Sequence, residues 1–285
     1  MEMKKYLACV AASEKTWKNL STYLFRANFL KYRESFDLAV ALNGNNSDAV
    51  NFIKTINPEY FFIRENRGFD QAALDHIIKN TPQYEFYIFL HDDHWFFYSN
   101  WFEIIEQLFE KYPDVDAWGN LSIFDKQFYA DDDSKHLLKL LGYEEYINKD
   151  WQFIVMGLAG FYRGKVIKWL LENKGIPHIK NDDYNYTHIV ERLFTCVLVN
   201  NNYNISQIPP GYEEFLRHKN HYEKNKFTDE IKKLIKEKRI AEANSKIAET
   251  EKLFPRDVGI YLAIGPAFYK NGFIKELDSL SKLSK

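Results

Sequence analysis

The sequence has few cysteines and no long apolar run. Only two cysteines occur among the 285 residues. Cys9 and Cys196 both lie in apolar stretches, without a partner at metal-binding spacing, so we expect two core thiols in a reducing compartment. No uninterrupted apolar stretch approaches eighteen residues, so we expect no transmembrane helix. The apolar run at residues 6–12 follows two lysines, as in a signal peptide. It is short and leads into a polar helical segment, which favours a buried strand in a cytoplasmic protein.

Glycine and proline are also scarce, and the basic and acidic residues nearly balance. The chain has 12 Gly and 8 Pro, which excludes collagen-like and low-complexity chains. Its 38 basic and 40 acidic residues give a net charge of −2, so it lacks the basic excess of a general nucleic-acid binder. Hydrophobic residues make up 46% and aromatic residues 17% of the chain, enough apolar surface to drive folding.

The first hundred residues alternate between strand and helix patterns. Apolar runs predict strands at residues 6–11, 36–42, 60–64 and 86–90. Helical spacing follows from Trp17 and at residues 49–56, 69–80 and 101–112. This order predicts an α/β fold with a mostly parallel sheet flanked by helices. Ligands of such sheets bind at the carboxyl ends of the strands, which places Asn43, Asn66 and residues 91–94 in one candidate cleft.

The rest of the chain is less regular. We expect extended segments at residues 117–124, 151–162 and 205–208, a polar loop at 131–133, and helices at 165–171 and 189–199. Beyond residue 224 the sequence is rich in Lys and Glu, with apolar residues at helical spacing. This stretch resembles one and a half tetratricopeptide units, chiefly in segment 241–257, and a plain helical hairpin is the alternative. We therefore expect two domains, 1–223 and a helical appendage at 224–285 that offers a surface for a protein partner or a homodimer.

The strongest chemical signal is the sequence His91-Asp92-Asp93-His94 at the end of the most apolar strand. Two adjacent carboxylates at a buried strand tip repel each other unless a cation or hydrogen-bond donors face them. Hard oxygen ligands suit Mg²⁺ or Mn²⁺. The alternative is a solvated turn whose aspartates cap the next helix. The sequence favours a metal site because apolar residues flank the turn on both sides.

Together these motifs resemble the GT-A glycosyltransferases of the family-2 type. Segment 89–96, FLHDDHWF, is similar to their acid motif, and segment 65–72, ENRGFDQA, to a segment of bacterial rhamnosyltransferase-like members. The resemblance covers residues 6–210 and implies a GT-A-like, Rossmann-like domain.

The resemblance also implies site residues. Asp93 would meet the metal, Mn²⁺ or Mg²⁺, with His218 or His221 completing the site, and Asp92 would lie near the donor ribose or the metal. Glu191, in a segment similar to the family's Glu-Arg helix start, would be the catalytic base, and Asp182 and Asp183 are its rivals. The remaining implied donor-binding residues are Ala11, Asn43, Asn66, Gly68 and Asp70. The family's usual acidic pair after the second strand is replaced by Leu-Asn-Gly, which puts base recognition by Asn43 in doubt.

Sugar transfer requires these residue types. A carboxylate-bound cation stabilises the charge that develops on a departing nucleoside diphosphate, and a carboxylate such as Glu191 takes the proton of the attacking hydroxyl. We therefore expect a metal-dependent, inverting glycosyltransferase of polysaccharide biosynthesis. It would use a UDP-, dTDP- or GDP-sugar and a glycan, lipid-linked or protein acceptor, with peripheral membrane association as an option. The alternatives are a metal-dependent phosphohydrolase built on residues 91–94 and a non-catalytic binding module.

Overall fold

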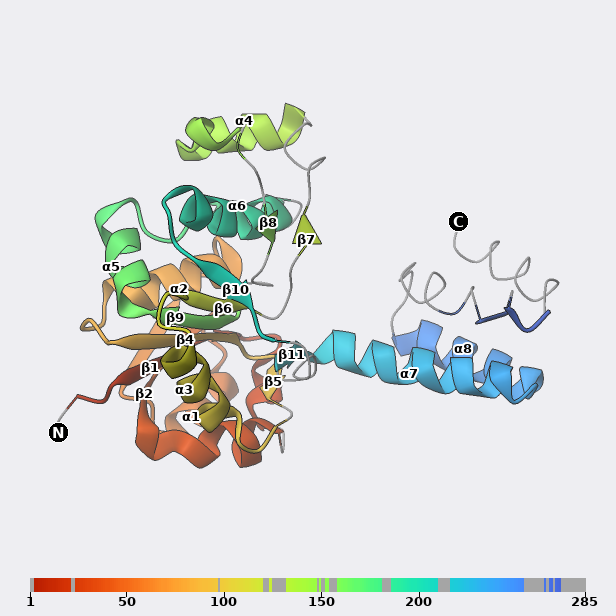
Figure 1. Ribbon diagram of the computed structural model, residues 1–285. Helices are drawn as coiled ribbons and strands as arrows, with labels where there is room; N and C mark the ends of the chain where they lie inside the picture. Colours follow the sequence, from red (N-terminus) through yellow and green to blue (C-terminus); the bar gives the residue numbers. More distant parts are fainter. Residues whose placement is uncertain are drawn as a thin grey trace. The chain divides into compact units, whose positions relative to one another are not determined.

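The chain forms two compact units, Met1–Arg217 and His218–Lys285, which are described separately. The computed structural model describes residues 3–21, 24–96, 98–119, 123–124, 132–147, 149, 152–153, 158–180, 186–209, 216–253, 264, 267–268 and 270–272. Figure 1 shows the helices and strands along the chain.

In the described part of the first unit, seven strands form one sheet in the order β3-β2-β1-β4-β9-β6-β10. These strands are β1 (Tyr6–Ser13), β2 (Phe36–Asn43), β3 (Tyr60–Arg64), β4 (Phe86–His91), β6 (Ala117–Gly119), β9 (Gly160–Arg163) and β10 (Ile205–Gln207). β1 lies parallel to both β2 and β4, and β9 is antiparallel to β4 and β6. The strand order reverses between β1 and β4, and this reversal is the kind of position where α/β sheets bind ligands.

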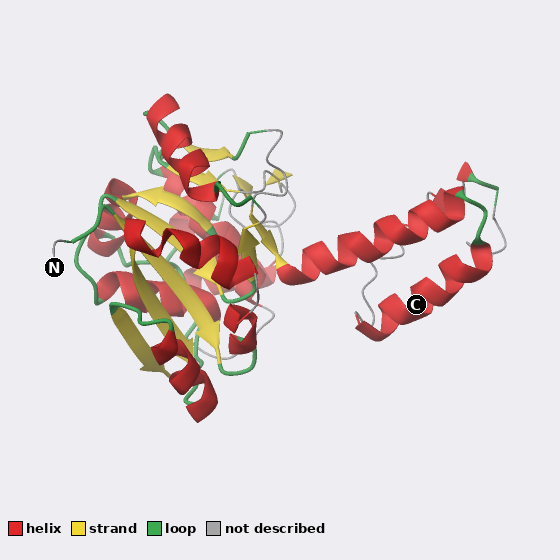
Figure 2. Ribbon diagram, turned by 90° about the horizontal axis from the view of Figure 1, so that it is seen from below, coloured by secondary structure: helices red, strands yellow, loops and turns green. Residues whose placement is uncertain are grey.

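Helices cover both faces of this sheet (Figure 2). Alternate residues of β1 pack on opposite faces, as the pleat of a strand requires. One face carries α1 (Ser47–Thr55) and α3 (Trp101–Lys111). The other face carries α2 (Phe69–Lys79), α5 (Gly164–Glu172) and α6 (Thr187–Asn200). The predicted α/β class with a mostly parallel, helix-covered sheet is confirmed, and the first cysteine is a buried core residue in β1.

The segment after β1 differs from the expected regular helix. It forms three short turns of 3-10 and π type, η1 (Trp17–Ser21), η2 (Leu24–Phe29) and η3 (Leu30–Ser35). The ring of Phe29 lies 4.9 Å from Phe36 and 5.7 Å from Trp101, both measured between centroids. These aromatic contacts with residues outside the segment favour short irregular turns, which the helical spacing alone does not predict.

The middle of the chain also contains more elements than expected. The expected extended segments 117–124 and 151–162 each contain two separate strands, with β7 (Ile123–Phe124) paired to β8 (Gln152–Phe153). The polar segment at 131–133 was expected to be a loop, but α4 (Asp132–Leu141) begins there. Leu137 and Leu138 of α4 join a cluster with α6 and the short turn η4 (Glu144–Tyr146), and this packing outweighs the polar start of the segment.

The second unit contains α7 (Lys219–Lys236) and α8 (Ile240–Leu253). It has its own apolar cluster, made by Ile231, Ile235, Ala243, Ile247, Ile264 and Phe268. The first of these helices begins before residue 224, the boundary expected from composition. A tetratricopeptide-like repeat stays a prediction, since most of residues 254–285 lie outside the described part. No helix among the described residues is long and apolar enough to cross a membrane.

Candidate functional site

The candidate site lies where β1 and β4 end side by side. β4 ends at His91, Asp92 and Asp93 form a turn, and β5 (His94–Phe96) follows. Ala11 of β1 is the register partner of His91, and its carbonyl accepts a 2.9 Å hydrogen bond from the Asp92 N–H. The acidic motif therefore occupies the point at which the strand order reverses, at the carboxyl end of β4.

Asp92 ties this turn to the segment that follows β1. Its side chain is buried, and Oδ2 accepts hydrogen bonds of 3.0 Å from the Ser13 N–H and 2.7 Å from the Thr16 hydroxyl. Burial is the main cause that raises the Asp92 pKa to about 7; the charge of Asp93 adds to it, and the two hydrogen bonds oppose it. The carboxylate is thus held by protein donors at the edge of the site.

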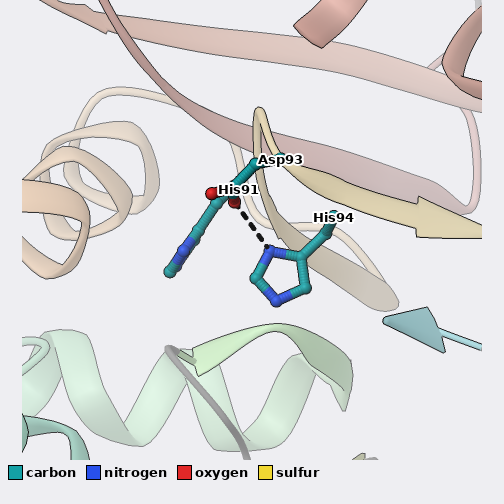
Figure 3. Close-up of side chains that lie close together, drawn as sticks. All are labelled: His91, Asp93 and His94. Atoms are coloured by element: carbon teal, nitrogen blue, oxygen red, sulfur yellow. Dashed lines mark ion pairs between the residues drawn. The ribbon is translucent and has the colours of Figure 1, made fainter. Parts of the chain in front are cut away.

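Three side chains of the turn form a potential cation site. His91, Asp93 and His94 each offer one ligand atom, and these atoms lie within 4.8 Å of one another. His94 Nδ1 lies 3.5 Å from Asp93 Oδ1, and the two imidazole rings are nearly perpendicular, with centroids 4.8 Å apart. Figure 3 shows the three side chains gathered at the turn. Both histidines are buried, while the Asp93 side chain is 19% exposed.

Helices α2 and α6 add carboxylates around His91. Asp70, in the first turn of α2, places Oδ2 3.3 Å from His91 Nδ1. Burial lowers the His91 pKa, but the negative charges of Asp70, Asp93, Glu191 and Asp92 oppose it, and the net pKa is raised. Glu191 of α6 is thus close enough to act on His91 electrostatically. The site combines two imidazoles with carboxylates from three elements.

The predicted donor residues Asn43, Asn66 and Gly68 lie at the end of β2 and in the turn between β3 and α2. Asn43 is 1% exposed; its Nδ2 donates to the Phe69 carbonyl at 3.2 Å and its Oδ1 accepts from Arg64. Gly68 precedes α2 with φ 71°, and a Cβ there would lie 2.3 Å from the Ile179 carbonyl oxygen. Asn66 lies half-buried in the same turn. Close packing against the segment after α5 accounts for a glycine at this position.

Several predicted residues lie outside the described part of the chain. The backbone places His218 in β11 (Leu216–His218) and His221 in α7, but their side chains are among those not described. Asp182 and Asp183 are not described either.

His91 and His94 were expected at a metal only in the phosphohydrolase alternative, and the Thr16 hydroxyl was not predicted as a donor to Asp92. A signal for the histidines was present, because they flank the carboxylate pair directly in the sequence. The hydroxyl had no such signal, since it comes from a separate segment.

Solved structures with a similar fold include known glycosyltransferases. No protein-family model and no curated protein sequence matches the chain. The structure of S. aureus TarS 1-349 has a TM-score of 0.46 and 12% identity, covering 97% of this chain and 83% of that one. The mannosyltransferase PcManGT from Pyrobaculum calidifontis, in complex with GDP-Man and Mn²⁺, has a TM-score of 0.41 and 12% identity, with coverages of 95% and 74%.

The similarity is not confined to sugar transfer. A CMP:2-keto-3-deoxy-manno-octonic acid synthetase complexed with CTP has a TM-score of 0.42 and 10% identity, covering 72% of this chain and 89% of that one. In another match this chain spans 35% of the longer TarS structure. All of these TM-scores lie below 0.5, so the reaction has to be inferred from the residues of this chain.

Proposed function

We propose that this protein is a metal-dependent glycosyltransferase that uses a nucleotide-sugar donor. The observation that carries the proposal is the position of His91, Asp93 and His94 at the reversal of strand order, with the charge of Glu191 contributing to the raised pKa of His91. A cation-binding group beside a carboxylate base is the minimum that displacement of a nucleoside diphosphate requires.

The residues present fit a divalent cation. The Asp93 carboxylate and the buried His91 Nε2, which makes no hydrogen bond to a described residue, are both suitable ligands. When bound, Mn²⁺ or Mg²⁺ would supply positive charge for the leaving diphosphate. His218 or His221 as a further ligand stays part of the proposal.

Glu191 takes the acceptor proton in this proposal. The acceptor oxygen forms a bond to the anomeric carbon of the sugar, and the bond from that carbon to the phosphate oxygen breaks. The nucleoside diphosphate leaves with the electron pair, the acceptor proton passes to the carboxylate, and a single displacement of this kind inverts the anomeric centre. Asp92 fixes the turn beside the donor, and Ala11, Asn43, Asn66, Gly68 and Asp70 are the proposed surroundings of the donor.

The proposal also covers the substrates, the binding partners and the cellular location of the protein. The donor is a UDP-, dTDP- or GDP-sugar, and the acceptor a glycan, a lipid-linked saccharide or a protein, in the cytoplasm or at the membrane periphery. The helices of the second unit are proposed to bind a protein partner or a second copy of the chain.

A phosphohydrolase is the second candidate, favoured by the grouping of two histidines with one aspartate. In that case the site would release phosphate without an acceptor, and Glu191 would contribute little. Replacement of Glu191 should therefore impair sugar transfer but have little effect on phosphate release.

The deciding experiment is Glu191→Gln, which keeps the side-chain size and removes basicity. Donor consumption is measured with a panel of acceptors, and phosphate release without one. We expect sugar transfer to fall by about 10²- to 10⁴-fold while donor binding is retained. Glu172→Gln, which alters an exposed carboxylate on α5, is the control and should leave both unchanged. Phosphate release that exceeds transfer and is indifferent to Glu191 would contradict the proposal.

A further inference from the structure

We propose that His91, Asp93 and His94 form one site for a divalent transition-metal ion, in which Asp70 is a positioning residue that orients His91. This site prefers Mn²⁺, Co²⁺ or Zn²⁺ over Mg²⁺. The inference deepens the proposed function and rests on it only for the role of the ion in sugar transfer. The site itself follows from contacts within the described turn and α2.

The three ligand atoms are near the spacing that one ion needs. Atoms bound to the same ion at about 2.1 Å lie roughly 3 to 4 Å apart. The candidate atoms of His91, Asp93 and His94 lie within 4.8 Å of one another. Small rotations about side-chain bonds therefore bring all three into one coordination shell, without movement of the backbone turn.

The state of His91 provides a second, independent observation. Its side chain is 9% exposed, Nδ1 lies 3.3 Å from Asp70 Oδ2, and the buried Nε2 makes no hydrogen bond to any described residue. A buried ring nitrogen without a partner is costly unless a ligand engages it. A histidine that binds a metal through one nitrogen commonly donates its other N–H to a carboxylate, which fixes the ring orientation and the tautomer.

Asp70 is well placed for that second role. It lies in the first turn of α2, and the preceding Gly68 is fixed by its close approach to the Ile179 carbonyl. The carboxylate is therefore presented by a regular helix with a fixed start. Its side chain is 38% exposed, so Asp70→Asn can be made without disturbing the core.

The chemistry of the ligands selects the class of ion. Imidazole suits Zn²⁺, Co²⁺ and other transition metals, whereas Mg²⁺ prefers oxygen ligands and keeps most of its water. Two imidazoles and one carboxylate leave Mg²⁺ with one preferred ligand among three. Affinities for the same ligands should rise from Mg²⁺ through Mn²⁺ to Co²⁺ and Zn²⁺.

The test is metal binding by the full-length protein without any sugar nucleotide. Co²⁺ is titrated while its visible absorption bands are recorded, and Mn²⁺, Zn²⁺ and Mg²⁺ compete for the site. We expect one ion per chain with Co²⁺ bands typical of nitrogen ligands, and Mg²⁺ at least about tenfold weaker than Mn²⁺. His91→Gln and His94→Gln should each weaken binding by at least about tenfold and change the bands. His136→Gln, on the exposed face of α4, is the matched control and should change nothing.

Asp70→Asn separates positioning from folding. It should weaken Co²⁺ binding by about 10- to 100-fold and shift the bands, because a neutral amide orients His91 less strongly. Glu65→Gln removes an exposed carboxylate from the turn that precedes α2 and should leave the spectrum unchanged. Urea unfolding tests whether each variant is folded. If His91→Gln does not fold, the Co²⁺ binding of Asp70→Asn tests the inference instead.

The outcomes separate the two claims. Equal binding of Mg²⁺ and Mn²⁺, or a Co²⁺ spectrum indifferent to both His91 and Asp70, would overturn the inference. A protein that binds Co²⁺ as described but transfers no sugar upholds this site and contradicts the proposed function. A protein that transfers sugar but binds Mg²⁺ as tightly as Mn²⁺ upholds the proposed function and contradicts this site.

Discussion

The Thr16 hydroxyl donates a 2.7 Å hydrogen bond to the carboxylate of Asp92, joining the segment after β1 to the turn after β4. The acceptor oxygen is buried and also receives the Ser13 N–H. This link crosses the point where the strand order reverses. It keeps the two strand ends that line the candidate site at a fixed separation.

Thr16→Val tests this link. It keeps the shape of the side chain and leaves the buried carboxylate with one donor fewer, so we expect unfolding free energy to fall by about 1–3 kcal/mol. Urea unfolding measures the change. Thr55→Val is the control, because the Thr55 hydroxyl donates to the Phe52 carbonyl at an exposed position of α1. A loss no greater than in the control would contradict a structural role for the link.

Gly68→Ala tests the close packing at the start of α2. The new Cβ would lie 2.3 Å from the Ile179 carbonyl oxygen, with the backbone at φ 71°. Gly142→Ala has the same backbone cost, at φ 74°, but its nearest neighbour is the Lys174 ammonium at 3.8 Å. We expect about 1 kcal/mol of destabilisation for the control and clearly more for Gly68→Ala. Equal losses in urea unfolding would contradict the packing explanation.

The main features of the sheet could be predicted from the sequence. The runs at β1, β2 and β4 are apolar throughout because these central strands are covered by helices on both faces, and such runs are visible without a structure. The position of Asp93 at a strand tip followed from the same pattern. Local signals were sufficient wherever burial alone determined the element.

The remaining features depend on contacts between distant segments. The 3.3 Å contact between His91 Nδ1 and Asp70 Oδ2 joins β4 to α2, and the hydrogen bond from Thr16 to Asp92 joins residues 76 positions apart. The irregular turns around Phe29 have aromatic neighbours in other segments, and Leu137 of α4 belongs to an apolar cluster that includes residues of α6. A single sequence carries no periodicity that reports such pairs.

Glu59 makes stability depend on pH. Burial raises its pKa, but the hydrogen bond from the Leu38 N–H at 2.7 Å and the contact with Arg33 outweigh it, so the pKa is lowered below 4.5. A lowered pKa contributes stability above the unfolded value, and that contribution disappears as pH falls through the folded value. Glu59→Gln should therefore be less stable than wild type at pH 7, and the difference should shrink as the pH falls toward 3. Urea unfolding across this range, with exposed Glu34→Gln as control, measures it; a constant difference at all pH values would contradict the assignment.

The two units are predicted to fold independently. The second unit has a separate apolar cluster, so a chain ending at Arg217 should retain a cooperative unfolding transition. Circular dichroism and urea unfolding of the shortened chain provide the measurement. An aggregated product, or a transition without cooperativity, would show that residues 218–285 complete the core of the first unit.

The most direct test of the account is the dependence of nucleoside diphosphate binding on a divalent cation at Asp93. Asp93→Asn removes one negative charge at nearly constant shape, and titration calorimetry of wild type and variant with UDP or GDP, with and without Mn²⁺, measures the effect. We predict that Mn²⁺ strengthens binding to the wild type and that the variant loses about 1–3 kcal/mol of this metal-dependent affinity. Equal affinities for both proteins in both buffers would contradict a metal-assisted nucleotide site at the end of β4.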